Sequence, residues 1–163
     1  MVKAWLVAAV LLVPDPGPAR RGNPCAGDEA SVVVETRERG LFLCESGQPL
    51  ERFTVAVGRG GTGKLARGDL RTPLGSYPLG APRASRRFGI FIPVGYPTSD
   101  QRRQGLTGTA VGIHGPARSL RWLGPLNTFY DWTAGCVVVG SDAEMDRIAG
   151  WVLRHRPTRV EIR

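Results

Sequence analysis

The chain has 163 residues, of which 42% are hydrophobic and 22% charged, a balance that excludes a disordered protein and fits one globular domain. Its formal net charge of +8 fits a polyanionic partner, but no basic helix or basic-aromatic motif is present, which argues against a nucleic-acid-binding protein. Its 22 glycines and 13 prolines separate short valine- and isoleucine-rich runs, a pattern that favours strands and turns over a helical bundle.

The first residues predict an export signal. Lys3 supplies the positive start, residues 4–13 form an apolar run, and a proline-rich segment follows it. This run is too short for a stable membrane span, which takes roughly 20 residues, although it could instead be a buried first strand or helix. We predict a signal peptide over residues 1–20 without a clear cleavage site, a linker over 21–29 and a folded domain over 30–163. The protein is therefore expected in the cell envelope, in the periplasm or the cell wall.

Short apolar runs between polar turns predict a series of strands. A short helix is expected over residues 99–105. A longer helix begins at the capping box Ser141-Asp142-Ala143-Glu144, carries apolar residues at i, i+3, i+4 and i+7 from Met145, and ends near residue 156. The fold class is therefore predicted to be mostly β with one packed helix in the C-terminal half. The expected strands are residues 31–34, 41–44, 53–57, 88–93, 110–114, 137–139 and 159–163, with a turn over 72–77 leading into one more.

The glycine-rich stretch 58–68 matches the spacing of a dinucleotide loop and the opening of a phosphate-binding P-loop. However, Leu65 follows Lys64 where a P-loop has a hydroxyl residue, and no helix follows either match. Without a helix N-terminus, an anion site loses its dipole and its aligned amides. We therefore predict a flexible glycine-rich connection, and we assign no adhesion role to Arg67-Gly68-Asp69.

Two stretches of the chain carry acid–base and nucleophilic chemistry. His114 ends an apolar segment and precedes Gly115, and Cys136 follows a Thr-Ala-Gly turn and precedes three valines. A thiol needs a neighbouring imidazole to form a useful amount of thiolate near neutral pH. Cys136 is therefore the candidate nucleophile, and His114 the candidate base that takes its proton and later gives it to a leaving amine. The structural alternative is a buried thiol and a hydrogen-bonded core histidine.

The neighbours of this pair indicate how it would be arranged. The backbone amides of Gly135 and Cys136 would form an oxyanion hole if they point into the site. The histidine needs an orienting acceptor, for which the Gly115 carbonyl and the Asp131 carboxylate are candidates. His155 is a poorer partner because it ends the predicted helix among arginines and is expected to face solvent. A zinc site is not expected, since the chain has no CxxC or HxxxH spacing.

Export of the chain would assign the three cysteines to one disulfide and one free thiol. An exported protein reaches a space in which disulfides form, so Cys25 and Cys44 are a candidate bridge and Cys136 stays free. The alternative is that Cys25 and Cys44 are unpaired and that Cys44 is merely buried in a strand.

Several segments occur in the order found in one known family. They are the hairpin strand 41–43, Thr72-Pro73-Leu74-Gly75, which matches a TPxG motif, Gly95-Tyr96-Pro97, Ile113-His114-Gly115, and Gly135-Cys136 before a capped helix. Residues 30–163 therefore resemble an L,D-transpeptidase catalytic domain of the YkuD type. The resemblance implies a β-sandwich-like fold around the Cys/His pair, without a metal or an organic cofactor.

The same resemblance implies a reaction on the stem peptides of peptidoglycan. Cys136 would attack the carbonyl of the L-centre residue in a tetrapeptide stem, and the terminal D-alanine would leave. The acyl-enzyme would then pass to an amine of a second stem, to a wall-anchored protein or to water. A carbapenem-type inhibitor is expected to add covalently to Cys136.

The chain departs from the common motif of this family, Ser/Thr-His-Gly-Cys followed two residues later by arginine. Ala134 replaces the second histidine and Val138 replaces the arginine, while Thr133 keeps the first position. Arg118 or Arg121, in the loop between base and nucleophile, could supply the lost cationic contacts; the alternative is that both are solvated loop charges. The candidate substrate-binding residues are Thr133, Asp131, Arg118 and Trp132.

The leading hypothesis is therefore a peptidoglycan L,D-transpeptidase. An L,D-carboxypeptidase, or a hydrolase that releases wall-linked protein, would use the same Cys/His chemistry. A peptidoglycan-binding module without activity is the alternative of another class, and the intact Cys136 and His114 argue against it.

Overall fold

The computed structural model describes residues 22–25, 27, 29–108 and 110–163. The predicted signal peptide, residues 1–20, lies outside the described residues. The helical elements are α1 (Ser99–Arg103), α2 (Asp142–His155) and the 3₁₀ segment η1 (Arg118–Thr128). The strands are β1 (Ser31–Glu35), β2 (Gly40–Glu45), β3 (Gln48–Ala56), β4 (Gly75–Pro78), β5 (Arg83–Ser85), β6 (Gly89–Pro93), β7 (Gly112–His114), β8 (Val137–Val139) and β9 (Arg159–Ile162).

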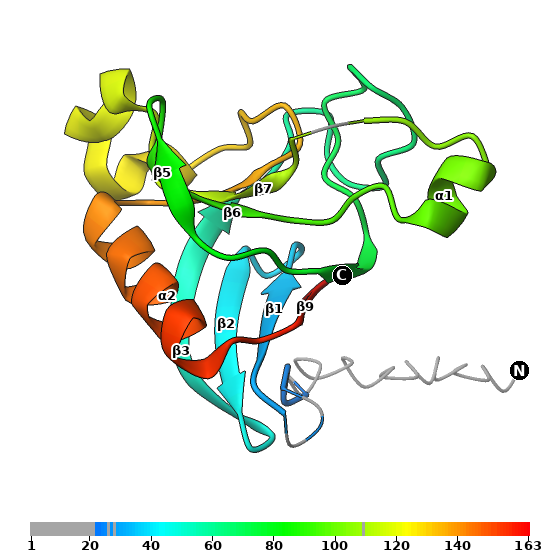
Figure 1. The fold of residues 1–163 in the computed structure, drawn as a ribbon. Helices are drawn as coiled ribbons and strands as arrows, with labels where there is room; N and C mark the ends of the chain where they lie inside the picture. Colours follow the sequence, from blue (N-terminus) through cyan, green and yellow to red (C-terminus); the bar gives the residue numbers. More distant parts are fainter. Residues whose placement is uncertain (1–21, 26, 28, 109) are drawn as a thin grey trace, which may run out of the picture.

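The strands form one curled sheet in the order β4-β9-β1-β2-β3-β8-β7-β6-β5 (Figure 1). β1 pairs in parallel with β9 and β7 with β8, and the other neighbours are antiparallel. β3 is shared by two parts of the sheet, because its residues up to Thr54 pair with β2 whereas Val55 and Ala56 pair with β8. We call β4, β9, β1, β2 and β3 the scaffold half, and β8, β7, β6 and β5 the hairpin half.

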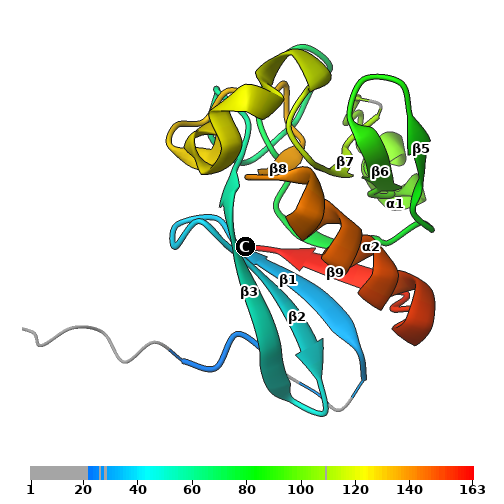
Figure 2. The same cartoon turned by 90° about the vertical axis from the view of Figure 1, so that its left-hand side faces the viewer.

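Both halves of the sheet and α2 pack on one hydrophobic core. Successive residues of a strand point to opposite faces, so Val32 and Val34 of β1 enter this core while Val33 joins a smaller cluster on the opposite face. In Figure 2, α2 lies between the layer of β1, β2, β3 and β9 and the strands β5 and β6. The predicted mostly β fold with one packed helix in the C-terminal half is confirmed. Core residues of the other elements include Leu41, Leu43, Phe53, Ile92, Ile113, Val137, Val139, Ile148, Val160 and Ile162.

Helix α2 begins and ends as its sequence predicts. The Ser141 hydroxyl accepts a hydrogen bond from the Glu144 amide, and the Glu144 carboxylate accepts one from the Ser141 amide, which is a complete capping box. Arg156 adopts a left-handed conformation after the last turn, and Pro157 prevents continuation. The buried residues of the helix, which form its core-facing side, are Met145, Ile148, Ala149, Trp151 and Val152.

Two elements have no counterpart in the expectations from sequence. Strand β5 is only three residues long and polar at Arg83 and Ser85, so it carries no apolar alternation. The segment η1 is two 3₁₀ turns joined at Gly124, where the backbone leaves helical geometry before Pro125. Neither element shows a local hydrophobic pattern: β5 pairs with the neighbouring β6, and η1 contacts β3 and β8.

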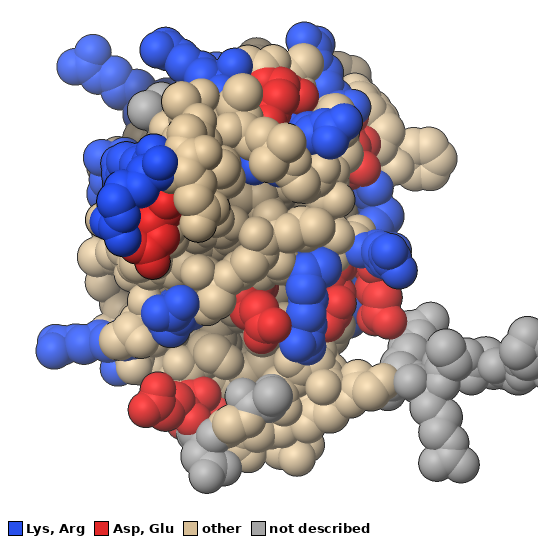
Figure 3. Space-filling model, turned by 90° about the vertical axis from the view of Figure 1, so that its right-hand side faces the viewer, with Lys and Arg blue, Asp and Glu red and all other residues tan. Residues whose placement is uncertain are grey.

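The face shown in Figure 3 carries Lys and Arg side chains that lie among Asp and Glu side chains rather than in one continuous basic patch. A continuous basic stripe is the usual footprint of nucleic-acid binding, and this face lacks one. Within the described residues, the helices are too short and too polar to cross a bilayer.

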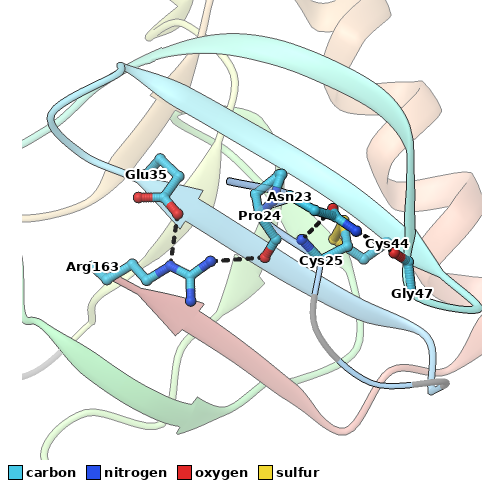
Figure 4. The surroundings of a disulfide bond; sticks show 7 residues. All are labelled: Asn23, Pro24, Cys25, Glu35, Cys44, Gly47 and Arg163. Carbon is cyan, nitrogen blue, oxygen red and sulfur yellow. Dashed lines mark hydrogen bonds and ion pairs between the residues drawn. A yellow bond between two sulfur atoms is a disulfide. The ribbon is translucent and has the colours of Figure 1, made fainter. Parts of the chain in front are cut away.

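The segment before β1 is fastened to the scaffold half (Figure 4). Cys25 and Cys44 form a disulfide, with their Cα atoms 5.4 Å apart. The Asn23 side-chain amide donates to the Gly47 carbonyl at 2.6 Å, and Arg163 at the other end of the chain donates to the Pro24 carbonyl at 2.8 Å. These contacts tie both ends of the described chain to strands of the same half.

Candidate active site

The parallel pairing of β7 with β8 brings the two predicted catalytic residues together. Ile113 lies opposite Val137 and His114 opposite Val138. Cys136 precedes Val138 by two residues, so its side chain leaves the sheet on the same face as that of His114. Both residues line a cavity of about 610 Å³.

His114 is buried and held in one orientation. Its Nδ1 lies 2.6 Å from the Gly115 carbonyl oxygen, which can only accept, so Nδ1 carries the proton and Nε2 keeps a free lone pair. Its ring stacks on Phe88 with centroids 3.7 Å apart. Of the two orienting groups considered from sequence, the Gly115 carbonyl makes the contact and Asp131 does not.

The environment of His114 favours the neutral ring. Burial is the main effect on His114, and it lowers the pKa of the ring to about 4. The positive charge of Arg87 also lowers the pKa, whereas the hydrogen bond to the Gly115 carbonyl raises it. The imidazole is therefore unprotonated near neutral pH, which is the form that a general base requires.

Cys136 is the free cysteine of the described residues and is partly exposed. Its thiol donates to the Ala110 carbonyl at 3.4 Å, and within the described part of the chain no hydrogen bond joins it to His114. Burial raises the pKa of the Cys136 thiol, while the Gly112 amide, Arg87 and Lys64 act in the opposite direction. The resting pair is therefore a neutral thiol and a neutral imidazole.

The turn before Cys136 is fixed by Thr133 and Gly135. The buried Thr133 hydroxyl accepts from the Gly135 amide at 3.1 Å and donates to the Cys136 carbonyl at 2.7 Å. Gly135 has φ of +125°, and a Cβ at this position would lie 2.5 Å from the Arg71 carbonyl oxygen. Only glycine fits here, both because of its conformation and because of this close approach.

This turn changes the predicted oxyanion hole. The Gly135 amide already donates to Thr133, so it is not free to bind an oxyanion as the sequence suggested. The Cys136 amide donates to none of the side-chain or loop acceptors of the described residues. Thr133, a candidate substrate-binding residue, lines the cavity and also holds the turn in shape.

Asp131 and Arg118, two of the candidate substrate-binding residues, do not line the cavity. The Asp131 carboxylate accepts from Arg39 at 2.8 Å and from the Val57 amide at 3.0 Å, so it ties the loop before Cys136 to the end of β3. Arg118 is exposed at the start of η1, which carries its side chain outside the cavity. Arg121 pairs with Asp142 at 2.8 Å instead.

Trp132, another candidate substrate-binding residue, does line the cavity. Its indole nitrogen donates to the Asn127 carbonyl at 2.8 Å, and its ring meets His114 edge-on with centroids 6.4 Å apart. The exposed Ala134 also lines the cavity, beside Gly135 and Cys136.

A model of the YkuD family, the L,D-transpeptidase catalytic domain, matches residues 29–162. The chain belongs to this family. The structure shows where the residue lies that replaces the motif arginine of this family. Val138, at the position of the motif arginine, is fully buried in β8 between Ala56 of β3 and His114 of β7. The cations of this YkuD cavity therefore come from other segments, and they are Arg59, Arg83 and Arg87.

A search of curated proteins finds no match to the chain. Among solved structures, the chain is similar to the helical cell shape determining protein Pgp2 from Campylobacter jejuni, with a TM-score of 0.68 and 23% identity over 86% of this chain and 50% of that one. It is also similar to Bd1075 from Bdellovibrio bacteriovorus, with a TM-score of 0.62 and 20% identity over 83% of this chain and 48% of that one. LD transpeptidase LdtMt1 in complex with imipenem is similar with a TM-score of 0.51 and 14% identity over 84% of this chain and 60% of that one. The chain spans about half the length of the first two structures, and the likeness at these identities is one of fold.

The three cavity arginines were not found from the sequence. They lie in the loop after β3, in β5 and in the β5–β6 turn, and no motif or spacing connects these positions with the Cys/His pair. Phe88, which stacks on the imidazole, was predicted only as the start of a strand. These residues could have been assigned to the site only if the order of the strands in the sheet had been known.

The glycine-rich stretch is folded rather than flexible, which corrects the prediction. The Asp69 carboxylate accepts from the Lys64 ammonium at 2.7 Å and from the amides of Leu65, Ala66 and Arg71. Burial raises the pKa of Asp69, but Lys64 and these amides together hold it well below its usual range. Lys64 is 6% exposed and committed to Asp69, so it is not a phosphate-binding cation.

The remaining histidine lies away from the cavity. His155 stacks on Trp151 with centroids 4.6 Å apart, and its Nε2 lies 3.5 Å from a Glu45 oxygen. It is half-buried rather than facing solvent as predicted. Across the described residues, no group of three or more His, Cys, Asp and Glu side chains is arranged to hold a metal ion.

Proposed function

We propose that the chain is a peptidoglycan L,D-transpeptidase that releases the terminal D-alanine of a tetrapeptide stem and joins the remaining acyl group to an amine. The observation that carries the proposal is the pairing of β7 with β8, which places a neutral, oriented imidazole and a free thiol on one wall of an open cavity. The family supplies the reaction class, since its YkuD members are L,D-transpeptidase catalytic domains.

The first step activates the thiol. The Cys136 thiol turns from the Ala110 carbonyl and gives its proton to Nε2 of His114, whose Nδ1–H stays bonded to Gly115. The raised pKa of the thiol and the lowered pKa of the imidazole make this transfer unfavourable in the resting site. Proton transfer is therefore expected to accompany the attack on the substrate carbonyl rather than to precede it.

Attack forms a bond between the Cys136 sulfur and the carbonyl carbon of the third stem residue. The developing oxyanion is stabilised by the Cys136 amide. The bond to D-alanine then breaks, and the His114 imidazolium gives its proton to the departing amine, which leaves a thioester and a neutral imidazole. An amine from a second stem attacks this thioester, gives a proton to His114 and releases the Cys136 thiolate, which takes that proton back.

Water in place of the amine would give a tripeptide stem and a free enzyme by the same steps. The Cys/His chemistry permits both outcomes. Product analysis with a muropeptide mixture distinguishes them, since transfer yields cross-linked dimers and hydrolysis yields trimmed monomers. Cross-linked dimers are expected.

The proposal predicts which residues the release of D-alanine requires. Cys136→Ala should abolish release, and His114→Ala should lower kcat/KM by roughly 100- to 10,000-fold because the general acid and base is lost. His155→Ala is the matched control, and it should retain full activity because that ring lies on α2 beside Trp151.

Two results would contradict the proposal. Release of D-alanine by Cys136→Ala protein would exclude this nucleophile. Equal binding of peptidoglycan by wild type and Cys136→Ala, with no turnover by either, would identify a binding module instead.

A carbapenem offers a separate test of the nucleophile. One solved structure of similar fold is an LD transpeptidase in complex with imipenem. Imipenem should acylate Cys136 by opening its β-lactam ring, and intact-mass spectrometry should show one adduct on the wild type and none on Cys136→Ala. The role of Pgp2 as a helical cell shape determining protein supports a contribution of this chain to wall modification and cell shape.

The proposed substrate lies outside the cytoplasm, so we further propose that the chain is exported. The disulfide between Cys25 and Cys44 supports this location, because such bridges form and persist in oxidising compartments. Fractionation of cells that produce the full chain should recover it from the envelope with this bridge formed.

A further inference from the structure

Three arginines line the cavity without acidic partners. Arg59, Arg83 and Arg87 are exposed, and the ion pairs among the described residues use none of them. No aspartate or glutamate is among the described residues that line this cavity. Arginines crowded around an open cavity without counter-charges favour an anionic ligand, and guanidinium groups bind carboxylates in a paired geometry.

The strand order places these arginines on two sides of the catalytic pair. Arg59 follows β3, and its amide donates to the Thr133 carbonyl at 2.9 Å beside the cysteine turn. Arg83 lies in β5 and Arg87 in the β5–β6 turn. In the order β3-β8-β7-β6-β5, the strand β8, which Cys136 directly precedes, and the strand β7, which ends at His114, lie between them.

One cavity arginine, Arg87, is linked to the general acid through the Phe88 ring. Phe88 lies against the His114 ring with centroids 3.7 Å apart, and the Arg87 guanidinium carbon lies 5.2 Å from the Phe88 centroid. In the proposed reaction, His114 protonates the amine of the departing residue. The terminal carboxylate of that residue sits on the same carbon atom as the amine, so it lies on the side of the imidazole in the cavity that Arg87 also lines.

We propose that Arg87 binds the C-terminal carboxylate of the departing residue, and that Arg59 binds a carboxylate of the acyl-donor stem on the other side of the scissile bond. This inference rests on the proposed function and adds to it the specificity of the site. The enzyme then selects a stem whose scissile bond is followed by a single residue with a free carboxylate. It also prefers a third residue that carries a carboxylate of its own, such as diaminopimelate, over lysine.

The first test compares a tetrapeptide stem that ends in D-alanine with the same peptide ending in D-alanine amide. Amidation should lower kcat/KM of the wild type by roughly 10- to 100-fold, because a charge-assisted hydrogen bond is lost. Arg87→Gln should show the same loss on the acid peptide and little further loss on amidation, as a double-mutant cycle requires for a direct contact.

Arg86→Gln is the matched control for Arg87. Arg86 is exposed in the same turn but does not line the cavity, so its loss removes an equal charge without the proposed contact. It should leave kcat/KM and the amidation penalty unchanged. Equal effects of Arg86→Gln and Arg87→Gln, or a full amidation penalty in Arg87→Gln, would overturn the assignment of Arg87.

The second test compares stems with diaminopimelate and with lysine at the third position. The wild type should prefer diaminopimelate by roughly 10- to 100-fold, and Arg59→Gln should remove this preference. Arg67→Gln is the control, because Arg67 is an exposed loop residue outside the cavity. A preference that survives in Arg59→Gln, or equal use of both stems by the wild type, would overturn this half of the proposal.

A binding measurement separates failure of this inference from failure of the proposed function. Calorimetric titration of Cys136→Ala protein with the acid and amide peptides needs no turnover and should show the same 10- to 100-fold difference, absent when Arg87→Gln is added. Equal affinity for the two peptides would refute the carboxylate subsite, whatever the activity. Absence of D-alanine release by the wild type, together with carboxylate-dependent binding, would refute the reaction and leave the subsite standing.

Discussion

The scaffold half and the hairpin half of the sheet are built by different means. In the scaffold half, β3 has nine residues and β2 has six, and tight turns join consecutive strands whose buried residues recur in the sequence. In the hairpin half, β5, β7 and β8 have three residues each, and β7 pairs with β8 although the two strands lie far apart in the chain. The long strands secure the fold, and the short ones position the residues of the site.

This difference explains why the cavity forms in the hairpin half. Short strands leave most of the hairpin half in loops, and loops tolerate the polar side chains and exposed backbone groups that a reactive site needs. The N-terminal disulfide and the Arg163 contacts all fall in the scaffold half. Changes in the hairpin half should therefore affect activity more than stability, and changes in the scaffold half should do the reverse.

Outside the catalytic pair, the largest expected effect on activity is at Gly135. In Gly135→Ala the new Cβ meets the Arg71 carbonyl, so the turn must move and displace Cys136. Misplacement of a reacting group by about 1 Å costs roughly 100-fold in rate, and kcat/KM for D-alanine release should fall by that factor. Gly105→Ala is the control, because Gly105 also has a positive φ but no atom within 4 Å of the added Cβ. Equal activity of the two variants would show that the cysteine turn is not rigid.

Loss of the disulfide should lower stability without lowering activity, the opposite of the result expected for Gly135→Ala. Replacing both Cys25 and Cys44 by alanine should lower the free energy of unfolding by about 3 kcal/mol, because the closed loop no longer limits the unfolded chain. The kcat for D-alanine release should not change at temperatures where the variant is folded. Urea denaturation and steady-state kinetics on the same preparation check this, and a large fall in kcat would show that the two halves are coupled.

The smallest expected effect is that of mild acid on activity. An ordinary histidine base would lose roughly fivefold in kcat/KM between pH 6.5 and 5.5, but burial lowers the pKa of His114 to about 4, so the profile should stay flat down to about pH 5. A half-maximal rate near pH 6.5 would contradict the buried, neutral imidazole.

The same group should make stability depend on pH. Its pKa is lower in the folded than in the unfolded chain, so the unfolded chain binds more protons between about pH 4 and 6.5. Stability from the neutral ring is present above about pH 6.5 and is lost as the pH falls through this window. His114→Gln should remove this slope in denaturation measured from pH 7 to 4.5.

Much of the scaffold half and the longest helix could be predicted from the chain. The apolar runs of β1 and β2, the turn at residues 45–48 and the capping box at Ser141 are local patterns, and each is found in the structure. Cys136 and His114 were also singled out from local features, since each adjoins glycine and an apolar run. The polar strand β5 and the 3₁₀ turns of η1 carry no such pattern, and they were missed.

The sequence by itself determined the fold class, the family and the candidate nucleophile and base, because hydrophobic periodicity, caps and short motifs consist of neighbouring residues. The tertiary structure alone decided which charges and amides surround the sulfur. It assigned Asp131 to Arg39, the Gly135 amide to Thr133, and the cavity cations to Arg59, Arg83 and Arg87. The Asp131–Arg39 pair and the cavity arginines bring together residues far apart in the chain, and this depends on strand order, which follows from how the whole chain buries its apolar surface.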